Sequence, residues 1–237
     1  IRQHNAYCIL KAAEDAKAMG LKGIRIIEFG VATGAGLMNM SKIAKKVSKI
    51  TAIDIDVIGF DSGEGLTPPD GYKDYSDRFQ LGDYEMDTDT LKKNLDTNTT
   101  LILGDVKDTI PNFLKDANHD KPIAYIVLDL DLYTSSKYAL HILTGKPSLY
   151  MPTLYLYLDD IDEFRHSTFC GEELAVKEFN QKNTLRKIEP FHFLKTLRLC
   201  KNPKWIQKIF KVHIFDHDIF SKSLPNKKKT IVNPYLT

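Results

Sequence analysis

The stretch Ile24-Arg25-Ile26-Ile27-Glu28-Phe29-Gly30-Val31-Ala32-Thr33-Gly34-Ala35-Gly36-Leu37 decides the fold of this chain. Its β-branched start predicts a strand that stops at Gly30, and apolar residues at helical spacing predict a helix over 35–48. Glycines between the two elements let the backbone turn sharply and approach a ligand closely. The helix would present its first N–H groups to that ligand.

Strand-like and helix-like segments alternate along the rest of the chain. Such alternation predicts an α/β fold, a mostly parallel sheet with helices on both faces, whose ligands bind beyond the carboxyl ends of the strands. We predict one domain over residues 1–237, with a surface tail from about residue 221. Further strands are expected over 57–60, 101–103, 123–128, 153–158 and 209–215, and helices over 5–20, 88–95, 109–114, 135–143 and 171–180.

Composition restricts the classes of partner. The 237 residues carry a formal net charge of +2, and no apolar run approaches the roughly 18 residues of a membrane span. We therefore expect neither a nucleic acid nor a membrane as partner. A basic run from 186 to 211 is interpreted as a solvated face rather than a polyanion site. Three cysteines far apart in the sequence favour a reducing, cytoplasmic location.

Acidic residues at the first strand ends indicate what the ligand is. The spacing Gly-x-x-x-Gly-x-Gly departs from the dinucleotide fingerprint, and Glu28 would repel a pyrophosphate but suits the ammonium of a methionine moiety. Asp61 follows the second strand, where an acid commonly accepts ribose hydroxyls. Asp54 and Asp56 remain alternatives for that role. Asp105, in a Gly-Asp turn, is a candidate for the adenine amino group.

More acids end the fourth and fifth predicted strands. Asp129 and Asp131 follow one strand, and Asp159 and Asp160 follow the next. Neighbouring parallel strands lie about 4.8 Å apart, so these carboxylates would crowd together at one sheet edge. A divalent cation such as Mg²⁺ or Ca²⁺ would relieve the repulsion. The alternative is that Asp159 and Asp160 cap a helix or that nearby Lys and Arg neutralise the acids.

Taken in order, these segments resemble a known enzyme family. Residues 28–36 resemble motif I of the Rossmann-like S-adenosylmethionine-dependent methyltransferases. The ordered set over roughly residues 5 to 218 is similar to a bacterial branch of the macrocin O-methyltransferase group. The segments that carry this second resemblance are Gly59-Phe60-Asp61-Ser62-Gly63-Glu64-Gly65-Leu66, Gly82-Asp83-Tyr84, Asp129-Leu130-Asp131-Leu132-Tyr133 and Asp159-Asp160.

The resemblance implies a Rossmann-like, seven-stranded sheet and an enzyme that methylates a hydroxyl of a sugar or of another small natural-product-like acceptor. It implies S-adenosylmethionine as cofactor and Mg²⁺ assistance. It makes Asp131 the general base and Asp129, Asp159 and Asp160 the metal ligands. The cofactor-binding residues that it implies are Glu28, Gly30, Ala32, Thr33, Gly34, Asp61, Ser62, Gly104, Asp105, Val106 and Asp129.

The chain also departs from the family pattern. Gly63 stands where the sugar enzymes usually have an aromatic residue, Thr67 stands where they have proline, and their Gly-Gly turn is replaced by residues 145–152. The long aromatic loop 62–87 is predicted to close over the site. Two other classes stay open: a nicotinamide-dependent oxidoreductase and a non-catalytic binding protein. Whether the chain forms a homo-oligomer is also open.

Overall fold

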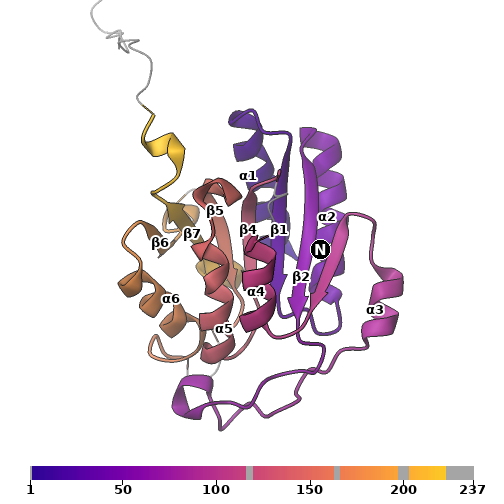
Figure 1. Ribbon diagram of the computed structural model, residues 1–237, viewed down its shortest axis with the longest axis vertical. Coiled ribbons are helices and arrows are strands. Elements are labelled where there is room, and N and C mark those ends of the chain that lie inside the picture. Colours follow the sequence, from indigo (N-terminus) through magenta and orange to yellow (C-terminus); the bar gives the residue numbers. More distant parts are fainter. Residues whose placement is uncertain (1, 116–119, 163–165, 197–202, 223–237) are drawn as a thin grey trace, which may run out of the picture.

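A computed structural model of the protein describes residues 2–115, 120–162, 166–196 and 203–222 (Figure 1). Its centre is a seven-stranded sheet in the order β3-β2-β1-β4-β5-β7-β6. The strands are β1 (Gly23–Phe29), β2 (Asp54–Asp61), β3 (Thr99–Leu103), β4 (Ile123–Leu128), β5 (Tyr150–Leu158), β6 (Arg186–Pro190) and β7 (Ile209–Ile214).

The pairing of the strands confirms the predicted mostly parallel, Rossmann-like sheet. Strands β1 to β5 pair in parallel, whereas β7 runs antiparallel to both β5 and β6. The strand order reverses between β1 and β4, which is where ligands bind on sheets of this kind. Every residue of β4 is buried, as its nearly all-apolar sequence predicts for a strand covered on both faces.

Helices cover both faces of the sheet (Figure 1). Helices α1 and α2 contact each other on one face, and α5 contacts α4 and α6 on the other. On α2 the buried side chains Leu37, Met40, Ile43, Ala44 and Val47 recur at the predicted helical spacing. The helices are α1 (Gln3–Ala18), α2 (Ala35–Thr51), α3 (Thr88–Asn94), α4 (Val106–Lys115), α5 (Tyr133–Ala139), α6 (Gly171–Lys182) and α7 (Phe193–Thr196).

The basic run 186–211 differs from the sequence interpretation. Strand β6 forms there although its only strongly apolar residue is Ile188, because it gains its backbone partners from β7. Arg186 is buried, and its Nη2 lies 2.8 Å from Oδ2 of Asp216. The Nζ of Lys211 lies 3.2 Å from the ring centre of Tyr155. The prediction of a solvated face was therefore wrong for Arg186 and Lys211, which pack into the fold. Residues 197–202 of the run lie outside the described ranges.

The long loop 62–87 folds back on itself. The N–H of Leu66 donates to the Asp83 carbonyl at 2.8 Å, and the N–H of Gly82 donates to the Leu66 carbonyl at 3.0 Å. Between these contacts lies the 3-10 helix η1 (Gly71–Asp74). The loop therefore has a defined backbone path, and its predicted closure over the site stays a prediction.

Within the described ranges, every helix is too short or too polar to cross a lipid bilayer. The predicted surface tail from residue 221 falls almost wholly beyond Lys222, outside the part that the structure describes.

Candidate active site

A cavity of about 660 Å³ opens beyond the carboxyl ends of β1 to β5, at the reversal of strand order. It brings together nearly all of the residues singled out from the sequence, although they come from five different strand ends. Predicted residues that line the cavity are Glu28, Gly30, Ala32, Thr33, Asp61, Ser62, Gly104, Asp105, Val106, Asp129, Asp131, Asp159 and Asp160.

The glycine turn after β1 lies directly against the end of β4. Gly30 has φ +83°, and a Cβ built on it would lie 1.7 Å from the carbonyl oxygen of Asp129. Only glycine fits this contact, so the requirement is both conformational and steric. Gly34, also at φ +83°, stands before α2 and faces Leu91 instead of lining the cavity. Gly34 therefore contributes to the backbone conformation of the turn and not to the cavity surface.

The carboxylate of Asp61 holds that turn in place. One of its oxygens accepts from the N–H of Val31 at 2.7 Å and of Ala32 at 3.0 Å, and the other accepts from the N–H of Gly63 at 2.7 Å. A carboxylate has about four lone-pair sites, so capacity remains for a ligand hydroxyl. Asp54 and Asp56 lie at the start of β2 and bind Lys121, each at 2.7 Å. Of the three candidates, Asp61 is the one in the cavity.

Glu28 is a buried acid that faces the same cavity with only 1% of its surface exposed. Its Oε2 has no hydrogen-bond partner among the described residues. Burial, and after it the charge of Asp129, raise the pKa of Glu28 well above its ordinary value. A buried, unsatisfied carboxyl oxygen is costly, so a cationic ligand group placed here would stabilise the site.

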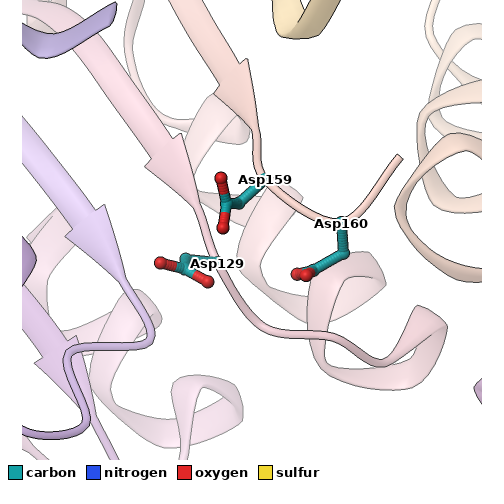
Figure 2. A group of neighbouring side chains, drawn as sticks. All are labelled: Asp129, Asp159 and Asp160. Carbon is teal, nitrogen blue, oxygen red and sulfur yellow. The ribbon is translucent and has the colours of Figure 1, made fainter. Parts of the chain in front are cut away.

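The acids that end β4 and β5 meet as the sequence predicts (Figure 2). Carboxylate oxygens of Asp129, Asp159 and Asp160 all lie within 4.8 Å of one another. Burial, and then the charge of Asp159, raise the pKa of Asp129 to about 7. Burial and the charge of Asp131 raise the pKa of Asp160 well above its usual range. Among the described residues, the next helix after Asp159 and Asp160 is α6, which begins at Gly171, so these two acids do not cap it.

Asp131 stands at the left-handed turn between β4 and α5, with φ +59°. Its N–H donates to Oδ2 of Asp160 at 3.0 Å. Aspartate tolerates this backbone region better than most residues. The turn therefore places the predicted base on the cavity wall and ties it to one acid of the cluster.

Two bases next to the cluster were not identified from the sequence. The Nη1 of Arg2 lies 3.7 Å from Oδ2 of Asp129, and the Nζ of Lys208 lies 3.7 Å from Oδ1 of Asp159. Lys208 also donates to the carbonyl oxygen of Asp159. Arg2 and Lys208 are far from these acids in the sequence, so no local spacing could reveal them. Lys137, the base nearest in sequence, donates instead to the Tyr133 hydroxyl.

Glu172 is a further acid that the sequence did not single out. It is 1% exposed, and its Oε2 accepts from the N–H of Asp160 at 3.2 Å. Burial, and then the charge of Asp160, raise the pKa of Glu172 well above normal. An acid in the first turn of a helix is common, so its sequence position carries no special signal.

Loop 62–87 contributes several residues to the cavity wall. Thr67, Leu81 and Tyr84 line it, with Ser135 from α5 beside them. Leu81 and Tyr84 expose 69% and 57% of their surfaces. This part of the wall therefore offers a ligand both apolar surface and the hydroxyl groups of Thr67, Tyr84 and Ser135.

One buried acid joins this loop to helix α5. Asp74 is fully buried and accepts from the N–H and the hydroxyl of Thr134, at 2.8 and 2.6 Å. Asp74 thereby satisfies an N–H group at the start of α5, which has no capping side chain of its own.

Comparison with known proteins supports the fold. No protein-family model matches the chain, and no curated protein sequence does. A crystal structure of CalS11, a calicheamicin methyltransferase, matches with a TM-score of 0.61 at 18% identity, covering 90% of this chain and 79% of that one. An apo structure of CalS11, described as a TDP-rhamnose 3'-O-methyltransferase, matches with a TM-score of 0.48 at 18% identity, covering 90% and 81%. The plantazolicin methyltransferase BpumL matches with a TM-score of 0.38 at 14% identity, covering 90% and 84%. The match to the first of these structures confirms the predicted Rossmann-like fold.

Proposed function

We propose that this protein is an S-adenosylmethionine-dependent methyltransferase that methylates a hydroxyl oxygen of a small acceptor, such as a sugar, with help from a divalent cation. One observation carries the proposal. The backbone of Asp129 touches the glycine turn at Gly30, while its side chain belongs to the acid cluster. The glycine turn, Glu28 and Asp61 form a group that suits the cofactor, which we call the cofactor cradle. It lies next to the acids that suit activation of the acceptor, in one cavity.

The cradle suits the chemistry of S-adenosylmethionine, which supplies an electrophilic methyl group on a sulfonium. The unsatisfied oxygen of Glu28 matches the methionine ammonium. Asp61, beyond β2, matches the ribose hydroxyls. Asp105 lies on the cavity wall near the expected adenine position, although one of its oxygens already accepts from the N–H of Lys107 at 2.8 Å.

The acid cluster suits a hard cation such as Mg²⁺. Three carboxylates converge there, and the two flanking bases, each 3.7 Å away, offset only part of their charge. Mg²⁺ prefers oxygen ligands and binds through a few carboxylates. A cation held by Asp129, Asp159 and Asp160 would neutralise this charge and lower the pKa of a nearby hydroxyl.

The remaining task of the chain is to orient the acceptor and take its proton. Methyl transfer is an in-line displacement, so the hydroxyl oxygen must lie on the axis of the breaking carbon–sulfur bond. Thr67, Tyr84 and Ser135 offer hydroxyl groups on the acceptor side. Asp131, between the cluster and this wall, would accept the proton of the hydroxyl as general base.

The two alternatives fit the molecule less well. A dinucleotide-binding sheet has the order 3-2-1-4-5-6, whereas here the neighbour of β5 is the last strand and is antiparallel. Glu28 at the turn also disfavours a pyrophosphate. A non-catalytic binding protein has no need of several buried acids with raised pKa values, which are more typical of active sites.

Binding and turnover test the proposal separately. Calorimetry should detect S-adenosylhomocysteine but not NAD, and Gly30→Val should abolish that binding. Methyl transfer from labelled S-adenosylmethionine should then be assayed with Mg²⁺ on a panel of glycosides, nucleotide sugars and catechols. Binding of NAD in place of S-adenosylhomocysteine would contradict the proposed class of enzyme. Transfer only to nitrogen acceptors would contradict the O-methyltransferase assignment.

A further inference from the structure

The beginning of α1 is anchored to the wall of the cavity. Its first residues contact groups from elsewhere in the fold. The N–H of Arg2 donates to Oδ1 of Asn39 at 3.3 Å, Trp205 donates to Gln3 at 2.8 Å, the ring of His4 stacks on Tyr157 at 3.9 Å, and Tyr125 donates to Asn5 at 2.8 Å. These contacts hold the backbone of Arg2 at a defined place beside the site.

The guanidinium of Arg2 lies next to Gly36, on the side where a side chain at that position would stand. Its Nη1 lies 3.1 Å from the point where a Cβ on Gly36 would stand, and Arg2 lines the cavity. Within the described part of the chain its ion pair is with Asp129, at 3.7 Å. That distance is longer than the 2.7–2.9 Å of a charge-assisted hydrogen bond. The contact with Asp129 therefore leaves the guanidinium able to bind a closer anion.

Glu28 lies near the same point. Its Oε1 lies 2.0 Å from that Cβ position, and its Oε2 is the buried oxygen without a partner among the described residues. A negative and a positive group thus face one small space, and it exists because residue 36 is glycine.

The start of α2 adds a second feature that favours an anion. The helix is preceded by Gly34, which has no side chain to cap it, and its first turn holds no acid. The N–H groups and the partial positive charge at the start of this 17-residue helix are therefore not satisfied by its own side chains.

We propose that Arg2, together with the start of α2, binds the α-carboxylate of the methionine moiety, while Glu28 faces its ammonium. The proposal rests on the proposed function, because it assigns a recognition group for the same cofactor. It makes Arg2 a specificity-determining residue: ligands with a complete amino-acid end satisfy both charges, and ligands without the carboxylate leave the guanidinium unpaired.

The role of Arg2 in binding the carboxylate can be tested by measuring two ligands on the wild type and on one variant. Calorimetry would compare S-adenosylhomocysteine with its decarboxylated analogue on the wild type and on Arg2→Gln. The wild type should bind the analogue about tenfold to a hundredfold more weakly, as for a hydrogen bond between charged groups. In Arg2→Gln the affinity for S-adenosylhomocysteine should fall while that for the analogue stays the same, so the preference shrinks by about tenfold.

The control is Arg78→Gln, the same substitution on another arginine of the cavity wall, which should keep the preference of the wild type. Equal loss of affinity for both ligands in Arg2→Gln would make Arg2 merely structural and overturn the proposal. So would a wild type that binds both ligands equally, a result that needs no variant. A wild type that binds neither ligand would instead contradict the proposed function itself.

Discussion

At the end of β2, Asp61 receives three backbone N–H groups, whereas at the ends of β4 and β5, Asp129, Asp159 and Asp160 face one another within 4.8 Å. Both groups of carboxylates border the same cavity. In the first region the backbone itself stabilises the negative charge, and the turn is complete before any ligand arrives. In the second region the acids repel one another, and burial and repulsion raise the pKa of Asp129 and Asp160. The proposed cation would relieve this repulsion, and among the described residues the first region has no comparable group of converging carboxylates.

The largest expected effect comes from removing one acid of the cluster. Asp159→Asn should lower the rate of methyl transfer at least a hundredfold, because cation binding supplies several kcal/mol of charge stabilisation. Affinity for S-adenosylhomocysteine should change by less than about threefold, since the cofactor cradle lies at β1 and β2. Excess EDTA on the wild type should reproduce the variant, and addition of Mg²⁺ should reverse only the EDTA effect. Full activity in EDTA would remove the cation from the mechanism.

The contact between the two regions can be broken at Gly30. Gly30→Ala should destabilise the fold by about 2–4 kcal/mol, because strain at positive φ adds to overlap with the Asp129 carbonyl. Gly20→Ala is the matched control: Gly20 has φ +75°, but a Cβ there meets nothing within 4 Å. Its cost should stay near 1 kcal/mol. Equal urea midpoints for the two variants would show that backbone strain alone matters and that the close approach does not.

The backbone-stabilised region can be tested at Asp61. Asp61→Ala leaves three N–H groups without their acceptor and should reduce cofactor affinity by about 1.5–3 kcal/mol. Because the turn loses its support, thermal stability should fall as well. Asp54→Ala, at the opposite end of the same strand, serves as control and should leave cofactor affinity intact. Calorimetry decides, and an unchanged dissociation constant in Asp61→Ala would exclude a ribose contact.

The smallest expected effect is a pH dependence of stability to which Asp129 of the repelling region contributes. The pKa of Asp129 rises from 3.8 to about 7, so between these values the folded protein holds a proton that the unfolded chain has released. The contribution of Asp129 to stability is therefore present at low pH and is lost as the pH rises towards 7. The melting temperature in EDTA should fall by a few degrees over this range. Mg²⁺ or Asp129→Asn should flatten the slope, and a slope unchanged by both would assign it to other groups.

The two regions also differ in how far the sequence predicted them. Glu28, Asp61, Asp129 and Asp159 were found because each follows from its position at the end of a strand, which hydrophobic patterns locate well. Arg2, Lys208 and Glu172 were missed because their contacts depend on how α1, the segment before β7 and α6 cross the sheet, and sequence spacing does not encode those crossings. Strand β6 was missed for a similar reason, since its pairing with β7 outweighs its polar composition.

The paired contacts of loop 62–87 enclose a segment that forms part of the proposed acceptor wall. Backbone hydrogen bonds join Leu66 to Gly82 and Asp83, and they close off the segment between them with Asp74 as its interior fastening. Residues 67–73 and 75–81 could then be exchanged as a cassette, with the sheet, the cofactor cradle and the acid cluster retained. Acceptor preference would become an interchangeable part of this scaffold, available to evolution and to engineering alike.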